Sequence, residues 1–349
     1  MVECQKQKKR DIGVILCWLQ ISTFLKIKKI MNVLSVFDGL SCGQIALNRV
    51  GIKYDKYFAS EVDKHAIKVT QHNYPNTIQL GDVTKVKGSD LPKIDLLFGG
   101  SPCQGFSFAG KQLNFDDPRS KLFFEFVRLK NELQPKYFLL ENVKMKKSSE
   151  DVITEYLGVK PILINSHLVS GQHRRRLYWT NIPGVEQPED RGILLKDILD
   201  NNVDGTKIEF DVNGEFQMTA KNGKIIRLNN KVEIPYTIYE TRTELGKSER
   251  KRIRELHGID STPRTKEHKE YLPLKTKKSN CLLTGESTLD YILDSNLTFR
   301  TYTINELERL QTLPVNYTNI GLSKNRIRKM IGNGWTVDVI SHIFKNMVI

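Results

Sequence analysis

The sequence is poor in cysteine, and its cysteines form no recognisable set. There are five in 349 residues, an odd number, and no two of them are spaced as Cys-x-x-Cys. Disulfide frameworks and structural zinc sites need paired or closely spaced cysteines. The pattern therefore argues against a disulfide-stapled domain, gives no indication of a metal site, and fits a reducing compartment.

Long apolar runs are also missing. The run from Ile12 to Leu19 follows a basic cluster and resembles a secretory signal, but it is shorter than a membrane span and no small-residue cleavage site follows it. We therefore expect no membrane association. Residues 1–30 are interpreted as an N-terminal extension, with two alternatives: a small amphipathic segment, or residues that are not native if Met31 is the true start.

Acidic residues are too few to balance the basic ones. The 54 Lys and Arg residues exceed the 40 Asp and Glu residues, so the formal charge is +14. Such a cationic surface favours a polyanionic partner, and nucleic acid is the commonest one. A generally basic host proteome would produce the same balance, so the charge alone does not decide.

From Met31 onward, short apolar runs alternate with segments of helical periodicity. The predicted strands are Asn32 to Phe37, Tyr54 to Glu61, Asp95 to Phe98 and Tyr137 to Leu140. The predicted helices are Gln44 to Arg49, Asp63 to His72 and Leu122 to Leu133. Repeated β-α units indicate an α/β fold with a doubly wound, mostly parallel sheet, which binds ligands at the carboxyl ends of its strands.

The pattern changes beyond about Pro183. Two Asn-Gly pairs predict β-hairpins, one over Phe210 to Met218 and one over Thr219 to Leu228, and Lys247 to Lys278 is rich in Lys and Arg. Helical patterns return over Ile304 to Gln311 and Val337 to Phe344. We therefore expect an α/β domain over residues 31–183, a smaller and partly β insertion over 184–298, and a return to the first domain over 299–349.

A glycine-rich loop follows the first predicted strand. It runs Phe37-Asp38-Gly39-Leu40-Ser41, and glycine there lets backbone amides approach a ligand at the start of the next helix. Two acidic residues follow at later strand ends, Glu61 and Asp82, where they could accept from ribose hydroxyls and an adenine amine. Acidic residues at such positions are also common helix caps. The three strand ends together favour an adenosyl cofactor.

A single cysteine stands at another strand end. Gly99-Gly100-Ser101-Pro102-Cys103 places a thiol directly after two glycines and a stiffening proline. A structural cysteine more commonly lies among bulky apolar residues, whereas a nucleophile needs access and nearby positive charge. The segment alone leaves both interpretations of Cys103 open.

Two further segments supply the charge. Glu141-Asn142-Val143 follows the predicted strand that ends at Leu140, and Gln172 to Arg176 follows a strand-like run from Ile162 to Val169. Alternate residues of an extended segment share a face, so Arg174 and Arg176 are expected to point into the same cleft. The alternatives are an ion pair of Glu141 with one of these arginines and a solvated run of arginines.

The ordered set of motifs resembles the DNA cytosine-5 methyltransferases, of bacterial or phage type with similarity to animal de novo enzymes. The matching blocks are Phe37-Asp38-Gly39, Glu61, Gly81-Asp82, Ser101-Pro102-Cys103-Gln104, Glu141-Asn142-Val143, Gln172-x-Arg174-x-Arg176, Arg300-x-x-Thr303-x-x-Glu306-x-x-Arg309-Leu310-Gln311 and Gly332-Asn333-Gly334-Trp335. The resemblance covers nearly everything after Met31.

The resemblance implies a Rossmann-like, class I S-adenosylmethionine-dependent methyltransferase fold and a covalent mechanism. Cys103 would attack a flipped cytosine, Glu141 would bond its ring nitrogen and amine, and Arg174 and Arg176 would orient it. The implied residues for S-adenosylmethionine are Phe37, Asp38, Gly39, Leu40, Ser41, Glu61, Val62, Asp82, Val83, Asn333, Gly334 and Trp335. The residues expected to bind DNA are Gln104, Ser107, Gln172, Arg250, Lys251, Arg252, Arg254 and Lys277.

The implied partner is double-stranded DNA, bound by the basic insertion, which would act as a target-recognition domain. A monomer in the cytoplasm of a bacterial or phage-infected cell is expected, and a cognate restriction endonuclease is a candidate partner. Two alternatives remain. A transfer RNA cytosine-5 methyltransferase would usually carry a Cys-Phe-Thr signature in the smaller domain, which is absent. A catalytically inactive DNA-binding homologue would usually have lost one of the catalytic residues.

Overall fold

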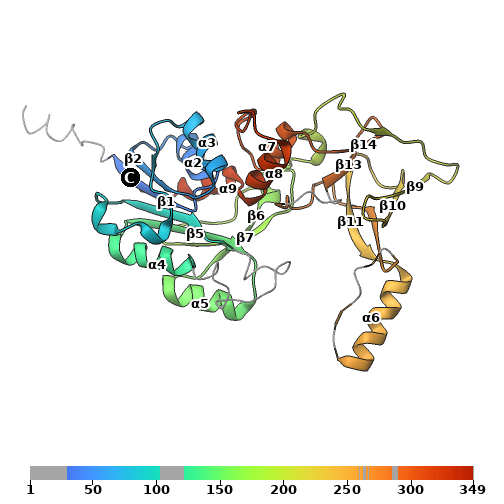
Figure 1. Ribbon diagram of the computed structural model, residues 1–349, viewed down its shortest axis with the longest axis horizontal. Helices are drawn as coiled ribbons and strands as arrows, with labels where there is room; N and C mark the ends of the chain where they lie inside the picture. Colours follow the sequence, from blue (N-terminus) through green and yellow to red (C-terminus); the bar gives the residue numbers. More distant parts are fainter. Residues whose placement is uncertain are drawn as a thin grey trace, which may run out of the picture.

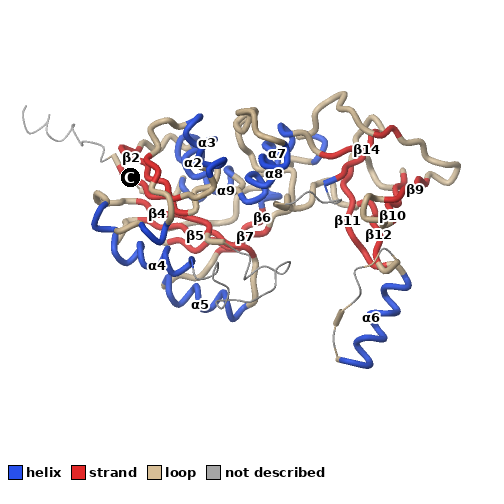
Figure 2. The backbone as a smooth tube through the Cα atoms, in the orientation of Figure 1, coloured by secondary structure: helices blue, strands red, loops and turns tan. Residues whose placement is uncertain are grey.

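The computed structural model describes residues 30–102, 122–258, 260–261, 265, 267–284 and 290–348. Its strands form two separate sheets of seven strands each. Figure 2 shows these sheets as two groups of strands joined by loops, and Figure 1 shows most of the helices gathered around the first sheet. The predicted cysteine nucleophile, Cys103, and the predicted DNA contacts Gln104 and Ser107 lie outside the described residues.

The first sheet has the strand order β3-β2-β1-β4-β5-β7-β6. Its strands are β1 (Met31–Val36), β2 (Tyr54–Ser60), β3 (Ile78–Gln79), β4 (Leu96–Gly100), β5 (Tyr137–Val143), β6 (Ile162–Asn165) and β7 (Arg175–Thr180). Strands β3, β2, β1, β4 and β5 are parallel, whereas β7 is antiparallel to both β5 and β6. The predicted doubly wound, mostly parallel sheet is confirmed.

Both faces of this sheet are buried, as expected for a parallel sheet covered by helices. Neighbouring residues of one strand pack in different cores: Val33 of β1 in one, Leu34 in the other. Strand β4 repeats this alternation with Phe98 and Leu97. The continuous apolar runs in the sequence reflect this burial on both sides, because side chains alternate along a strand.

Helices supply the two cores. Those packed in the Val33 core are α2 (Cys42–Arg49), α3 (Lys64–Asn73), α7 (Ile304–Leu310), α8 (Lys324–Asn333) and α9 (Val337–Phe344). Those packed in the Leu34 core are α4 (Leu122–Leu133) and α5 (Lys147–Leu157). The C-terminal helices thus return to the first sheet, where α9 lies against α2, in agreement with the predicted return of helical segments.

The second sheet has the order β8-β14-β13-β11-β12-β10-β9. Its strands are β8 (Thr206–Lys207), β9 (Glu215–Thr219), β10 (Ile225–Asn229), β11 (Tyr236–Arg242), β12 (Lys269–Pro273), β13 (Tyr291–Leu293) and β14 (Thr298–Thr301). All pairs are antiparallel except β10 with β12. Helix α6 (Glu244–His257) joins β11 to the segment before β12 and projects away from both sheets (Figure 1).

Two local predictions were wrong. The run from Ile162 to Val169 is not one strand: β6 ends at Asn165, whose side chain accepts from the backbone N–H of His167 and starts a 3₁₀ turn. The hairpin predicted over Phe210 to Met218 is only a turn, because Asp211 accepts from two following amides and the preceding strand β8 pairs with β14. The second hairpin, β9 to β10, is confirmed.

The second sheet begins and ends at other residues than the predicted insertion, which covers residues 184–298. Leu195 and Ile198 pack in the core of the first sheet, and the second sheet spans Thr206 to Thr301. We therefore propose domain boundaries near residues 200 and 301. Among the described residues, no helix is both long and apolar enough to cross a membrane.

Candidate active site

The loop after β1 is shaped by left-handed backbone at Phe37, Gly39 and Ser41. A Cβ added at Gly39 would meet no described atom within 4 Å, so the backbone there faces open space. Its N–H donates to Oε2 of Glu61 at 2.7 Å, which ties this loop to the end of β2. Although most of this loop is buried, Gly39 presents its backbone to open space near the start of α2.

Asp38 is the buried acid of this loop. Its Oδ1 accepts from the hydroxyl of Tyr57 at 2.8 Å, whereas its Oδ2 has no hydrogen-bond partner among the described residues. Burial raises the pKa of Asp38 to about 6, even though hydrogen bonds from neighbouring hydroxyls act in the opposite direction. A buried acceptor without a partner is unfavourable, so it marks a position where a ligand donor would fit.

Replacing Asp38 by asparagine is expected to stabilise the free protein at neutral pH. The folded-state pKa lies above the unfolded value of 3.8, so stability is highest below pH 3.8 and falls as the pH rises through about 6. Asparagine removes the buried charge, with a gain of up to about 3 kcal/mol at pH 7.5 and almost none at pH 4. Urea unfolding at both pH values measures this.

Asp55→Asn, at an exposed position on β2, is the control and should have little effect at either pH. An equal gain from Asp38→Asn at both pH values would show that ionisation of Asp38 is not the cause.

The other two predicted acids bind nearby backbone: Glu61 forms a local turn and Asp82 caps a 3₁₀ turn. Glu61 accepts from the backbone N–H of Gly39 with one oxygen and from those of Val62 and Asp63 with the other. Asp82 accepts from the N–H and hydroxyl of Thr84 at the start of a 3₁₀ turn. Both residues therefore bind local backbone, which is the structural alternative to cofactor binding. Each carboxylate can still accept further hydrogen bonds from a ligand.

Val62 and Val83, the predicted cofactor-binding residues that follow Glu61 and Asp82, differ in exposure. Val62 is exposed, whereas the side chain of Val83 is buried in the core against α4 and offers only its backbone to a ligand.

The ends of β4 and β5 meet at Gly100 and Glu141, which are register partners. A Cβ at Gly100 would lie 2.9 Å from both Oε2 of Glu141 and Nε1 of Trp335. Glycine is therefore needed for Trp335 to donate its indole N–H to Glu141, at 3.0 Å. Next in the chain, Ser101 accepts from the side chain of Asn142 at 3.1 Å, which fixes the segment that leads to Cys103.

The sequence predicts that Glu141 lies beyond the end of its strand. In the structure it lies inside β5. The strand continues to Val143 because β7 pairs with it there, which brings Arg176 opposite Val143. The Nε of Arg176 lies 3.0 Å from Oε1 of Glu141. Both oxygens of this largely buried carboxylate therefore accept from fixed donors, one on Arg176 and one on Trp335.

Arg174 faces the same way as Arg176, as the alternation predicts, but its partners are mostly backbone carbonyls. It donates to the carbonyls of Gly332 at 3.0 Å and Gly334 at 2.8 Å, and to that of Leu282 at 3.3 Å. Arg174 thus anchors the turn after α8 that carries Trp335. Within that turn Asn333 is exposed and Gly334 and Trp335 are half-buried.

A second thiol lies at these arginines, and sequence reasoning missed it. The sulfur of Cys281 lies 3.4 Å from Nη1 of Arg174 and 3.9 Å from Nη2 of Arg176. Burial raises the pKa of this thiol, but the two guanidinium groups outweigh burial and leave it below its usual value. No local motif marks Cys281, because the arginines are more than a hundred residues away in the chain.

The structure gives Gln172 a packing role instead of the predicted DNA contact. Its side chain is fully buried; its amide N–H groups donate to Leu310 and Gln311, and its oxygen accepts from the backbone of Leu282. The neighbouring Lys278, part of the basic stretch, is also buried and donates to the carbonyls of His167, Ser170 and Ile193. Neither side chain has a surface to offer DNA.

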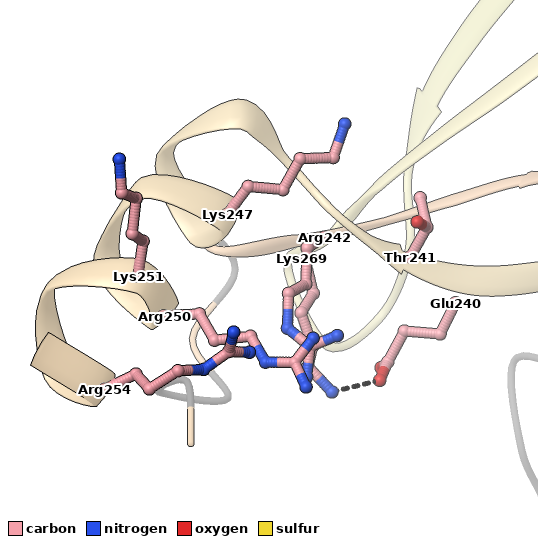
Figure 3. Close-up of a pocket in the computed structure, with 8 residues that line it drawn as sticks. All are labelled: Glu240, Thr241, Arg242, Lys247, Arg250, Lys251, Arg254 and Lys269. Carbon is pink, nitrogen blue, oxygen red and sulfur yellow. Dashed lines mark hydrogen bonds and ion pairs between the residues drawn. The ribbon is translucent and has the colours of Figure 1, made fainter. Parts of the chain in front are cut away.

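The remaining predicted DNA contacts lie on α6, where Figure 3 shows three of them, and in the loop after β12. They are Arg250, Lys251, Arg252, Arg254 and Lys277, and each pairs with an acidic side chain. None of the five is buried, so all remain available to a polyanion. Among the described residues there is no group of three or more His, Cys, Asp or Glu side chains that could hold a metal ion.

Comparisons with known proteins match this geometry to one family. A model of the C-5 cytosine-specific DNA methylase family matches residues 31–348. The chain is 30% identical over 342 residues to the type II methyltransferase M1.ScrFI of Lactococcus lactis subsp. cremoris, covering 97% of this chain and 83% of that protein.

A phage protein and a solved structure are also similar. The orphan methyltransferase M.SPRI of Bacillus phage SPR is 34% identical over 220 residues, 58% of this chain; the match spans half, 50%, of that protein's length. The Entamoeba histolytica methyltransferase EhMeth has the same fold, with a TM-score of 0.59 at 18% identity over 91% of this chain and 98% of that chain. The chain belongs to the C-5 cytosine-specific DNA methylase family.

Proposed function

We propose that the chain transfers a methyl group from S-adenosylmethionine to carbon 5 of a cytosine in a specific sequence of duplex DNA, through a covalent adduct with Cys103. The observation that carries this proposal is the Glu141 carboxylate, held by Arg176 and Trp335 beside Gly100. Because Cys103 follows Gly100 by three residues, the carboxylate and the thiol are expected to face one bound base.

The first β-α turn suits S-adenosylmethionine, the methyl donor of this family. The unpartnered Oδ2 of Asp38 and the remaining acceptor capacity of Glu61 fit an ammonium group and ribose hydroxyls, and the open space at Gly39 admits the ligand. The proposed binding residues are those implied by the sequence, Val83 contributing its backbone. When bound, the cofactor supplies the electrophilic methyl group of its sulfonium.

The chain's own residues then supply binding, orientation and proton control. The cytosine is flipped into the cleft, at an unstacking cost of about a few kcal/mol. The Cys103 thiolate bonds to carbon 6 while a proton shared between Glu141 and the ring nitrogen offsets the developing charge. After methyl transfer, the proton on carbon 5 passes to solvent, its bonding electrons form the double bond between carbons 5 and 6, and Cys103 leaves as the thiolate, which restores the aromatic ring.

The cleft imposes a condition on this sequence of steps. Both oxygens of Glu141 already accept hydrogen bonds, so a base must use their remaining lone pairs or displace one donor. Trp335 belongs to the turn that Arg174 anchors, whereas Arg176 also reaches Cys281. We propose that Arg176 releases Glu141 when the base binds and donates to the base instead. Cys281 is a second partner for Arg176 during this exchange.

The first experiment is methylation mapping. Purified protein is incubated with unmethylated genomic DNA and S-adenosylmethionine, and 5-methylcytosine is located by conversion sequencing. Methylation confined to one short motif supports the proposal. Binding of DNA without transfer would mean an inactive homologue. We further propose a cytoplasmic monomer with a cognate restriction endonuclease as candidate partner; size-exclusion chromatography with light scattering checks the monomer.

Transfer RNA remains a second candidate substrate because of Cys281. The related transfer RNA enzymes usually carry a Cys-Phe-Thr signature in the smaller domain; that signature is absent here, but Cys281 reaches Arg174 and Arg176 from the segment after β12. The same incubation with radiolabelled cofactor and transfer RNA decides between the substrates. Label in RNA with none in DNA would replace the DNA proposal.

A further inference from the structure

The indole ring of Trp335 joins a buried aromatic cluster to the acid of the cleft. The ring packs against that of Phe98 on β4, with 5.8 Å between the ring centroids. Phe98 is fully buried and also packs against Tyr57 and Phe344. The indole N–H donates to Oε2 of Glu141 at 3.0 Å. An apolar contact therefore orients the ring, and its single polar atom reaches the carboxylate.

The backbone on both sides of Trp335 is fixed as well. The carbonyl of Gly334 accepts from Nη2 of Arg174 at 2.8 Å and from the side chain of Gln311 at 3.1 Å. The hydroxyl of Thr336 donates to the same Gln311 side chain at 2.8 Å. Gln311 is fully buried, so these hydrogen bonds are shielded from water. The position of the indole N–H therefore follows from the fold and does not depend on Glu141 alone.

The two donors on Glu141 differ in what they can do when a base enters the cleft. The Nε of Arg176 lies 3.0 Å from Oε1, and its Nη2 also reaches Cys281 at 3.9 Å. In the proposed exchange, this side chain moves from Oε1 to the base. In the part of the chain that the structure describes, the indole N–H of Trp335 has Glu141 as its one acceptor. Trp335 therefore stays on Oε2 while Oε1 becomes free for the base.

The contact between Trp335 and Glu141 lies directly against the backbone of Gly100. A Cβ at Gly100 would come within 2.9 Å of both Oε2 and the indole nitrogen. Gly100 precedes the proposed nucleophile, Cys103, by three residues, so this hydrogen bond lies where that segment begins. Small displacements of a group that binds a reacting ring cost a large part of its effect. The donor that fixes Glu141 is therefore expected to affect the rate.

We propose that Trp335 is a positioning residue for methyl transfer: its indole N–H holds Oε2 of Glu141, so that Oε1 faces the cytosine when Arg176 releases it. Oε1 is then the oxygen that shares a proton with the ring nitrogen. The inference rests on the proposed function and extends it, because the resemblance places Trp335 only at the cofactor. Trp335 acts through Glu141, and this effect is independent of any contact with S-adenosylmethionine.

Trp335→Phe removes the donor and keeps an aromatic ring against Phe98. A hydrogen bond to a charged group contributes roughly one to two orders of magnitude in rate, so kcat on unmethylated genomic DNA is expected to fall about 30-fold. S-adenosylhomocysteine is the product that remains when the cofactor has lost its methyl group. Its affinity for the variant, measured by titration calorimetry, should stay within about twofold.

Trp179→Phe is the matched control. It removes the same atoms, and the indole N–H of Trp179 also makes a hydrogen bond, to the hydroxyl of Thr154 at 3.0 Å. Trp179 is buried on β7 in the Leu34 core, whereas Trp335 packs against the Val33 core. The kcat of Trp179→Phe should therefore stay within about twofold of that of the unaltered protein, whatever stability the variant loses.

A spectroscopic measurement tests the hydrogen bond without any turnover. The chain has three tryptophans, so protein labelled with nitrogen-15 gives three indole N–H signals, and the two phenylalanine variants assign those of Trp335 and Trp179. In Glu141→Gln a neutral acceptor replaces the carboxylate, and the weaker bond should move the Trp335 proton signal upfield. The Trp179 signal should stay in place.

Three results would overturn the positioning role. An unchanged kcat in Trp335→Phe would show that the indole N–H is dispensable. A loss of affinity for S-adenosylhomocysteine as large as the loss of kcat would assign the effect to cofactor binding. A Trp335 signal that Glu141→Gln leaves in place would exclude the hydrogen bond itself. Methyl transfer by the unaltered protein is measured first: its absence overturns the proposed function, whereas the three results above overturn the positioning role alone.

Discussion

Cys103→Ser is expected to lower methyl transfer by roughly a thousandfold or more while leaving DNA affinity within about twofold. The serine hydroxyl has the size of the thiol but is almost never ionised near neutral pH, so it cannot add to the ring as the thiolate does. Single-turnover transfer of labelled methyl groups to a duplex gives the rate, and anisotropy of the same duplex gives the affinity.

The matched control is the second thiol, Cys281→Ser. Its sulfur lies by Arg174 and Arg176, so of the two described thiols it is the one placed to compete as nucleophile. The other, Cys42, is buried, and burial raises its pKa to about 12. Cys281→Ser should retain transfer within about tenfold, because the arginines keep their other partners. Loss of transfer in Cys281→Ser with retention in Cys103→Ser would reverse the assignment of the nucleophile.

Most of the fold could be predicted because its signals are local. The strands β1, β2, β4 and β5 are short apolar runs that end in glycine or acidic residues, and α4 and α9 were predicted with their observed bounds. Errors arose where a side chain or a distant strand decided the outcome. Asn165 ends β6 with a side-chain hydrogen bond, and Glu141 stays in β5 only because β7 returns beside it.

The candidate site was less predictable, because it depends on contacts between distant segments. Arg174 and Arg176 were predicted to share a cleft from alternation alone, and they do share contact with Cys281. Nothing local indicates that Trp335 donates to Glu141, or that Gln172 is buried beneath the turn after α7. A conspicuous polar residue in a motif can therefore be buried and hydrogen-bonded between distant segments.

The segment around Arg300, one of the motifs in the resemblance, likewise has a structural role. Arg300 is buried on β14, where its guanidinium binds Asp294 through Nε at 2.9 Å and both oxygens of Glu306 on α7. Glu306 in turn accepts from the backbone N–H groups of Thr303 and Asp200. This network joins the second sheet to the helices of the first, so the block supports the assembly of two lobes.

Arg300→Met is accordingly expected to destabilise the protein by about 3–5 kcal/mol, because the apolar side chain leaves two buried carboxylates without their cation. The exposed fraction is 2% for the Arg300 side chain and 0% for that of Glu306, so water cannot replace it. A lower urea midpoint, followed by far-ultraviolet circular dichroism, measures the loss. Arg227→Met breaks the half-exposed pair with Glu270 on the second sheet and should cost less than about 1 kcal/mol.

The double change Arg300→Met with Glu306→Gln distinguishes two causes of the loss of stability: the unpaired charge of Glu306 and the lost packing of the Arg300 side chain. If the unpaired charges cause the loss, neutralising Glu306 should recover part of it, even though the single oxygen of glutamine replaces only one of the two acceptors that Glu306 offers to the N–H groups of Asp200 and Thr303. If the second change adds its own loss instead, the packing of the Arg300 side chain is what holds the lobes together. In that case the second sheet is held to the helices of the first by the shape of the Arg300 side chain, and an apolar residue at this position stays destabilising even when Glu306 is neutral.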